Sequence, residues 1–160
     1  MKTAVLLDFD RAVFDCAKFD ADHRSHKVRG NYVLFDAKRF IAKVKQQRGI
    51  SLIIFTQGEP DFQQLKLKVA GLNHEKIIIT PEFEKVRIIK RYLDGTKYLI
   101  DGVAYDNIIF VDDKSISFKG FGNLPRARGW CVRRFYKVND LSEPNVKIVD
   151  SLDEIDLRPG

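Results

Sequence analysis

The sequence has few of the residues that mark a secreted, zinc-binding or membrane-spanning protein. Its two cysteines, Cys16 and Cys131, lack CxxC spacing, which excludes a disulfide framework and a cysteine zinc site. The three histidines are too few and too scattered for a metal site. Apolar runs are only a few residues long, and Asp8 and Asp10 interrupt the N-terminal one, so neither a membrane span nor a secretory leader is visible. We therefore expect a soluble, cytoplasmic protein that does not enter a membrane.

The chain does have enough apolar residues for a core, and its positive charge is unevenly distributed. A hydrophobic content of 44% with 12 phenylalanines among 160 residues predicts one folded domain over 1–160, without repeats or linkers. The net charge is +6, and residues 16–48 alone hold nine Lys and Arg against three Asp. Residues 126–137 hold five Lys and Arg and no acid. Such clusters attract phosphates or nucleic acid, or simply form a solvated surface.

Strand and helix signals alternate along the chain. Strands are predicted at 4–7, 51–55, 76–80, 107–111, 130–132 and 146–149, and the first four have the largely continuous apolar sequence typical of strands buried on both faces. Helical patterns lie between them, at about 36–48 with Asp36 as N-cap, at 60–70 and at 82–93, and a capping box at Ser151 opens a short last helix. Residues 16–34 are expected to be irregular and 94–106 to form a loop with one short excursion at most. This order predicts a three-layer α/β/α Rossmann-like fold with a parallel sheet of five to six strands.

Polar residues follow three of the predicted strands. Asp8 and Asp10 end the first, Thr56 the second, and Asp112 and Asp113 the fourth. Because the carboxyl ends of parallel strands share one edge of a sheet, these side chains can converge there. Two acids at one strand end repel each other unless a cation lies between them, and a hard divalent ion would remove the conflict. The alternative is that Asp8 and Asp10 only close the strand as turn or cap residues.

Four motifs in this order resemble those of the haloacid dehalogenase-like hydrolase superfamily, over essentially the whole chain. The first is an apolar strand followed by Asp-x-Asp, here residues 8–15 with the sequence DFDRAVFD. The second is a strand ending in Thr, residues 53–58 (IIFTQG), and the third is Lys85 opening a helix. The fourth is residues 108–113 (IIFVDD). The resemblance implies a small phosphatase-type member without a substantial cap domain, and hence a phosphoric monoester hydrolase.

The resemblance also implies roles for individual residues. Asp8 would be the nucleophile that carries an aspartyl-phosphate, and Asp10 would act as acid and base. Thr56 and Gln57 would bind phosphate oxygens, and Lys85 would neutralise the phosphate together with Asp8. Each role has a simpler alternative, such as a strand end for Thr56 or a surface position for Lys85.

A magnesium ion is part of the same implication. Asp8, the backbone carbonyl of Asp10 and Asp113 would hold Mg²⁺, while Asp112 would orient the waters around it. Which of Asp112 and Asp113 binds the metal directly is left open, with Asp113 favoured. Lys90 is a weaker candidate than Lys85 for the third motif.

The chain departs from the family pattern directly after the two acids. Arg11 and Ala12 stand where the family usually has Gly and Thr, which puts the loop geometry and the rate in doubt. Arg11 could instead reach the substrate. Asp15 is expected to be a cap or turn residue rather than a catalyst.

The substrate is the least constrained part of the prediction. The first cap insertion point offers only a basic flap at about 11–35, in which Arg24, Lys27 and Arg29 favour an anionic substrate. An open site suits a phosphorylated small molecule or macromolecule, and in capless relatives a neighbouring subunit often serves as a lid. The alternative function is a catalytically inactive relative that uses its basic surface to bind nucleic acid or a protein partner.

Overall fold

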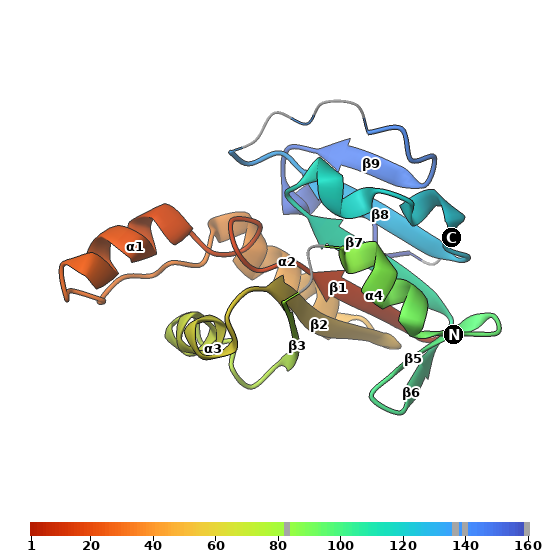
Figure 1. Cartoon of the computed structure of the whole chain (residues 1–160), viewed down its shortest axis with the longest axis horizontal. Coiled ribbons are helices and arrows are strands. Elements are labelled where there is room, and N and C mark those ends of the chain that lie inside the picture. Colours follow the sequence, from red (N-terminus) through yellow and green to blue (C-terminus); the bar gives the residue numbers. More distant parts are fainter. Residues whose placement is uncertain (82–83, 136–137, 139–140, 159–160) are drawn as a thin grey trace.

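The chain folds around a central sheet of six parallel strands. The structure is a computed structural model that describes residues 1–81, 84–135, 138 and 141–158. Strand β1 lies in the interior of the sheet, whose order is β3-β2-β1-β7-β8-β9 (Figure 1). The strands are β1 (Thr3–Leu7), β2 (Ile50–Gln57), β3 (Lys76–Thr80), β7 (Asn107–Asp112), β8 (Ala127–Val132) and β9 (Val146–Val149).

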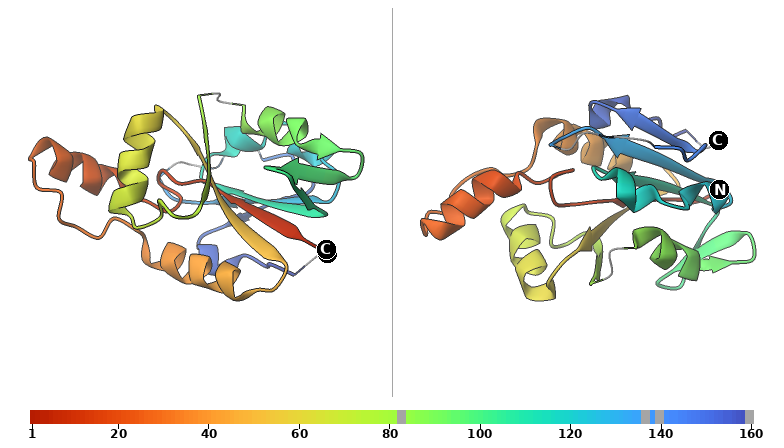
Figure 2. Two further views of the ribbon diagram at one scale, coloured as in Figure 1. Left: turned by 90° about the horizontal axis from the view of Figure 1, so that it is seen from below. Right: turned by 45° about the horizontal axis from the view of Figure 1, so that its top comes forward.

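Each face of the sheet carries its own apolar core. Alternate residues of β1 belong to different cores, Val5 and Leu7 to one and Ala4 and Leu6 to the other, as the period of a strand requires. The first core is covered by α2 (Phe35–Gln46), α3 (Pro60–Val69) and the 3₁₀ turn η3 (Leu152–Glu154). The second is covered by α4 (Lys85–Arg91) and the 3₁₀ turns η1 (Ser115–Phe118) and η2 (Phe121–Asn123) (Figure 2). The predicted three-layer α/β/α fold with a parallel sheet is confirmed.

The helix predicted over 82–93 is shorter in the structure. Helix α4 begins at Lys85 and ends at Arg91, while Glu82 and Phe83 lie outside the described residues. In the part of the chain that the structure describes, no helix has both the length and the apolar character needed to cross a membrane.

The irregular segment predicted over 16–34 is wrong for its first half. Residues 16–24 form helix α1 (Cys16–Arg24), which projects away from the sheet (Figure 1). The Asp15 side chain accepts a hydrogen bond from the Lys18 backbone N–H and caps the helix, the role expected for Asp15. Phe19 is its one buried residue, so the sequence carries no repeating apolar face that would have indicated a helix.

The loop predicted over 94–106 is also wrong. It holds most of a small antiparallel sheet of β4 (Leu93–Asp94), β5 (Lys97–Ile100) and β6 (Val103–Tyr105). Asp101 and Gly102 form the two-residue turn between β5 and β6, both with positive φ, which is the geometry that Asp-Gly favours in a hairpin. This dipeptide, between short strands with alternating burial, was the signal that sequence reasoning missed.

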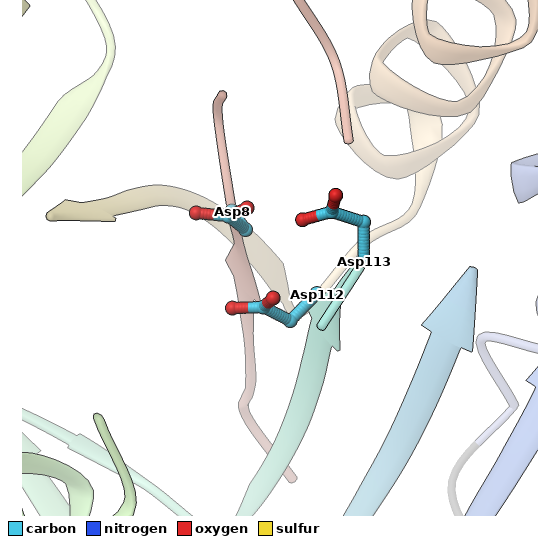
Figure 3. A group of neighbouring side chains, drawn as sticks. All are labelled: Asp8, Asp112 and Asp113. Atoms are coloured by element: carbon cyan, nitrogen blue, oxygen red, sulfur yellow. The ribbon is translucent and has the colours of Figure 1, made fainter. Parts of the chain in front are cut away.

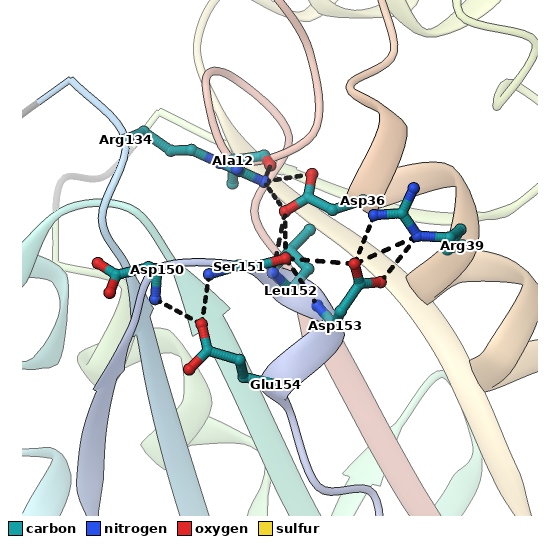
Figure 4. Close-up of polar contacts among 9 residues, drawn as sticks. All are labelled: Ala12, Asp36, Arg39, Arg134, Asp150, Ser151, Leu152, Asp153 and Glu154. Carbon is teal, nitrogen blue, oxygen red and sulfur yellow. Dashed lines mark hydrogen bonds and ion pairs between the residues drawn. The ribbon is translucent and has the colours of Figure 1, made fainter.

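Asp36 does not cap α2 as predicted, because Leu34 occupies the N-cap position. Its carboxylate instead accepts two hydrogen bonds of 2.8 Å from the Arg134 guanidinium, and others from Ser151 and the Leu152 backbone N–H (Figure 4). The same guanidinium donates to the Ala12 carbonyl at 3.0 Å. Asp36 and Arg134 thereby tie the turn after β1 to α2 and to the C-terminal segment.

We expect Arg134→Met to lower the free energy of unfolding by about 3 kcal/mol at pH 7, because it leaves the Asp36 carboxylate with little solvent and no ion-pair partner. Burial alone would raise the pKa of Asp36, but hydrogen bonds and the Arg134 charge hold this pKa below its usual value. A lowered carboxyl pKa gives stability above the unfolded-state pKa that is lost as the pH falls through the folded-state pKa. The penalty of Arg134→Met should therefore shrink in acid.

Urea unfolding at pH 7 and pH 3 measures this effect. Arg39→Met is the matched control, because Arg39 pairs with Asp153 at the surface, where side-chain exposures of 61% and 42% leave an ion pair worth at most about 1 kcal/mol. Equal losses in the two variants, or a penalty for Arg134→Met that does not depend on pH, would contradict the assignment.

Candidate active site

Three aspartates meet at the carboxyl edge of the sheet. Leu7 pairs with Val111 across β1 and β7, so the next residues along the two strands, Asp8 and Asp112, emerge side by side. Asp113 follows directly, and each of the three acids has a carboxylate oxygen within 4.8 Å of the others (Figure 3). All three are buried. Buried carboxylates this close cannot all remain ionised without a cation.

Lys85 supplies one cation to this cluster. Its ammonium lies 2.5 Å from Asp8 Oδ1 and 2.7 Å from Asp112 Oδ2, and its side chain is 5% exposed. Burial opposes the charge of Lys85, but the two carboxylates outweigh that cost and raise its pKa above the usual value, so it stays protonated. Lys85, the residue predicted for the third motif, is therefore in place. Lys90 lies farther along α4 and is exposed.

Asp112 and Asp113 differ in their partners. Asp112 accepts hydrogen bonds from the Lys85 ammonium and from the Lys114 backbone N–H at 2.9 Å. Both carboxylate oxygens of Asp113 are buried, and neither has a hydrogen-bond partner among the described residues. Burial, together with the Asp112 charge, raises the pKa of Asp113 to about 6.

This unpartnered carboxylate fits a bound cation. Burial and the neighbouring Asp112 also raise the pKa of Asp8 well above its usual value, in spite of Lys85. The cluster therefore has more acid than the one lysine neutralises, and its donors are all hard oxygens. Such a set suits a divalent ion that prefers oxygen ligands, and Asp8, Asp112 and Asp113 each offer one carboxylate oxygen to it.

Asp10 lies outside the aspartate cluster and is held from helix α3. The Lys66 ammonium lies 2.6 Å from Asp10 Oδ1, and the Gln63 amide donates to Asp10 Oδ2 at 3.0 Å. The Cys16 thiol also contacts Oδ1 at 3.4 Å, and burial, with the Asp10 charge, raises the pKa of Cys16 to about 12, so that thiol stays neutral. Gln63 and Lys66 are 3% and 4% exposed. Three side chains thus hold Asp10 in one orientation.

Sequence reasoning gave no role to Gln63 or Lys66. The two residues stand three positions apart on α3, so they share one face of the helix. A buried lysine is unusual unless it is paired, but burial is not visible in the sequence. Gln63 and Lys66 could have been found only by testing which polar side chains of the predicted helix over 60–70 can reach the carboxyl ends of the strands.

The structure also locates the predicted phosphate-binding residues. Thr56 is fully buried at the end of β2, and its hydroxyl donates to the Gln63 side-chain oxygen at 3.3 Å. The Gln57 carbonyl accepts from the Gln63 amide at 3.1 Å. Gln63 therefore links the end of β2 to Asp10. No described hydrogen bond joins Thr56 directly to the aspartate cluster.

Arg11, in the position where the family usually has Gly, has a φ of +67°. The left-handed region costs a side-chain-bearing residue about 1–2 kcal/mol, whereas glycine adopts it freely. Arg11 thus adopts the left-handed backbone conformation for which glycine is usually needed. Because the turn keeps this conformation, Asp8 and Asp10 stay at the sheet edge although the glycine is absent.

We expect Arg11→Gly to raise the free energy of unfolding by about 0.5–1 kcal/mol, because relief of the left-handed strain outweighs the entropy that glycine adds to the unfolded chain. Thermal unfolding measures the change. Arg48→Gly is the control, since Arg48 is exposed in a loop and has no positive φ. Strain at Arg11 would be contradicted if Arg48→Gly also stabilised the protein, or if Arg11→Gly destabilised it as much as Arg48→Gly does.

Comparison with solved structures identifies the fold. A haloacid dehalogenase-like family hydrolase from Xanthomonas campestris matches with a TM-score of 0.66 at 10% identity, over 95% of this chain and 92% of that one. A haloacid dehalogenase-like hydrolase from Burkholderia xenovorans LB400 matches with a TM-score of 0.57 at 15% identity, over 94% and 93%. The HAD domain of the Legionella pneumophila effector Lem4 gives a TM-score of 0.50 at 12% identity, over 86% and 89%.

The chain therefore has the fold of the haloacid dehalogenase-like hydrolases, as the order of its motifs implied. No protein-family model matches the sequence, and no curated protein matches it either. At identities of 10–15% the likeness concerns the fold, so the chemistry has to be argued from the side chains of this chain.

Proposed function

We propose that this protein is a magnesium-dependent phosphatase that hydrolyses a phosphomonoester through an aspartyl-phosphate on Asp8. The observation that carries the proposal is the asymmetry of the buried cluster. Asp8 is paired with the Lys85 ammonium, whereas the neighbouring Asp113 is buried without a partner. Phosphoryl transfer needs a nucleophilic carboxylate beside a fixed cation and beside oxygen donors that can hold a further cation, because the transferring group brings its own negative charge.

In the first half-reaction, an Asp8 carboxylate oxygen would attack phosphorus while the bond to the leaving alcohol oxygen breaks. Asp10 would give its proton to that oxygen, which makes a neutral alcohol and leaves Asp10 ionised. In the second, Asp10 would take a proton from a water that attacks the same phosphorus, the bond to Asp8 would break, and inorganic phosphate would leave. Lys66 and Gln63 would keep the Asp10 carboxylate oriented through both halves.

The remaining residues would bind the phosphoryl group. Lys85 would neutralise its oxygens as a point charge while it holds Asp8. The Thr56 hydroxyl would exchange its Gln63 partner for a phosphate oxygen, with Gln57 beside it. Magnesium held by Asp8, Asp113 and the backbone carbonyl of Asp10 would supply the further positive charge that lets Asp8 ionise.

An assay with p-nitrophenyl phosphate tests the proposal. We expect phosphate release in Mg²⁺ and none in EDTA.

A second function, non-catalytic binding through the basic stretch of residues 16–48, follows from its charge of nine Lys and Arg against three Asp. Absence of turnover in Mg²⁺, with affinity for nucleic acid that falls steeply as salt rises, would favour that second function.

We further propose that residues 11–35 act as a basic flap within a single domain of 160 residues. Phe19 and His23 of α1 contact the Phe62 ring of α3, at centroid distances of 6.1 and 6.0 Å. These contacts place α1 against α3, the helix that holds Asp10. Arg24 lies in the last turn of α1, at the end that projects from the sheet, so its positive charge would attract an incoming phosphate from a distance rather than bind it.

Magnesium should raise the melting temperature of the wild-type protein by about 5–10 °C at a concentration near 100 times its Kd, since such binding adds about 2.7 kcal/mol. Asp113→Asn should lose this response, because it removes the carboxylate that has no other partner. In EDTA the variant should be at least as stable as the wild type, since one buried like charge is gone.

Differential scanning fluorimetry with and without Mg²⁺ measures both effects. Asp94→Asn, at an exposed position on β4, is the matched control and should respond to Mg²⁺ as the wild type does. A full Mg²⁺ response in Asp113→Asn would show that Asp113 is not a ligand.

A further inference from the structure

A pocket of about 620 Å³ lies beside Lys85, on the side of the second core. Its walls come from the end of β2, from α4 and from residues 114–120. Lys85 belongs both to this wall and to the aspartate cluster, because its ammonium contacts Asp8. The pocket therefore shares two residues, Gln57 and Lys85, with the proposed phosphate site.

Five of the eleven described residues that line the pocket are basic, and Lys85 is one of them. Arg87 and Lys90 come from α4, and Lys114 and Lys119 from the segment that follows β7. All four are exposed, and none of them makes an ion pair with another residue in the part of the chain that the structure describes. Glu84 is the one acid among the described lining residues. Because these positive charges outnumber the one acid of the wall, the pocket favours an anionic ligand.

A basic surface with no ligand is the simpler alternative, and a second pocket helps to weigh it. That pocket, of about 510 Å³, is lined by residues of α2, by residues 47–50 and by the C-terminal segment. Its basic residues are equalled in number by acids in the same wall, and Arg158 pairs with Asp156 at 2.8 Å. The pocket beside Lys85 differs because its basic residues outnumber its one described acid. A surface that is only solvated usually has charges of both signs interspersed.

We propose that this pocket binds a second phosphate of the substrate, so that the enzyme selects a small molecule carrying two phosphates. This rests on the proposed phosphatase function. One phosphate would lie at Asp8 and Lys85, and the other among Arg87, Lys90 and Lys119, with no bond made or broken at the second.

The size and chemistry of the walls support a small ligand. A volume of about 620 Å³ is in the range of small-molecule sites. The Arg87 guanidinium can bind a phosphate in a bidentate manner, and Ser117, a buried residue in the wall, adds a hydroxyl. The exposed Ile116 side chain, also in the wall, offers an apolar contact for the body of the ligand.

Binding to the Asp8→Asn protein tests this proposal without turnover. Calorimetry compares fructose 1,6-bisphosphate with fructose 6-phosphate, and adenosine 3′,5′-bisphosphate with adenosine 5′-monophosphate, so that two phosphate spacings are sampled. We expect at least one bisphosphate to bind about tenfold or more tightly than its monophosphate, as two added charge contacts imply. Adding Lys90→Gln and Lys119→Gln together should reduce that preference to less than about threefold.

A control variant removes the same amount of charge elsewhere. Lys68→Gln with Lys147→Gln neutralises two exposed lysines outside this pocket and should leave the preference intact. Equal binding of bisphosphates and monophosphates, or a preference that survives Lys90→Gln with Lys119→Gln, would overturn the proposal.

Two further measurements separate the possible failures. A 5′-phosphorylated oligonucleotide that loses affinity in the Lys90→Gln, Lys119→Gln protein, while neither small bisphosphate discriminates, would overturn the assignment to a small molecule. Turnover of p-nitrophenyl phosphate by the otherwise wild-type enzyme, without any bisphosphate preference, would overturn the pocket proposal and leave the phosphatase function standing. A bisphosphate preference without phosphate release in Mg²⁺ would overturn the function, and with it the claim that the ligand is a substrate.

Discussion

Asp8→Asn should reduce phosphate release by at least about 10³-fold, the scale on which loss of a nucleophile acts. The asparagine amide keeps the size of the side chain but cannot form the acyl phosphate. The Lys85 ammonium keeps its second partner, Asp112, at 2.7 Å, so the cation stays in place and phosphate binding should persist. The loss should therefore fall on kcat, with a much smaller change in KM.

Stability separates a chemical loss from a folding defect. Asp8→Asn removes one of three clustered buried carboxylates, and Lys85 keeps Asp112 as its partner, so the free energy of unfolding in EDTA should not fall. Asp94→Asn, the same substitution at an exposed position, should keep full activity. Activity that persists in a folded Asp8→Asn protein would exclude Asp8 as the nucleophile, whatever role Lys85 has.

Two of the strands that were predicted are almost uniformly buried. The runs at 51–55 and 107–111 are buried on both faces, and continuous apolar sequence indicates that directly. The segments that were wrongly predicted bury little. Helix α1 has one buried residue, and β5 alternates between buried and exposed residues over only four positions. Patterns that short do not separate a helix or an edge strand from a loop.

Some residues of the candidate site could be predicted from the sequence and others could not. Asp8, Asp112 and Asp113 follow strands, so parallel topology alone brings them to one edge of the sheet. Lys66 and Gln63 reach Asp10 from the middle of a helix, and their direction depends on how α3 lies against the sheet edge. That packing is a tertiary property, and local sequence does not encode it.

The contacts around Asp10 bear on the departure from the family pattern at Arg11 and Ala12. Neither residue brings the tight-turn glycine or the hydroxyl that the family usually has there. The Ala12 carbonyl instead accepts from Arg134 at 3.0 Å, and Asp10 is held by α3. Groups from distant parts of the chain thus hold the turn in place without the two residues that the family usually has there.

Lys66→Met tests that interpretation most directly, and it should lower kcat by about 10²-fold, the smaller end of what a general acid and base contributes. Lys66 is 4% exposed and its ammonium lies 2.6 Å from Asp10 Oδ1. Methionine fills nearly the same volume, but it cannot hold the carboxylate, so Asp10 would spend less time aligned with the leaving oxygen. Because Lys66 acts through Asp10 in this scheme, KM should change far less than kcat.

Three further variants decide whether Lys66 positions Asp10 or only supports the fold. Lys66→Arg keeps the charge and should recover part of kcat, whereas a purely steric role would favour Met over Arg. Lys68→Met, on an exposed face of the same helix, should leave kcat unchanged. Asp10→Asn combined with Lys66→Met should be no slower than Asp10→Asn alone, since residues that act as a unit are not additive. A further drop in that double variant, or a rise in KM with kcat intact, would instead assign Lys66 to the binding of the substrate.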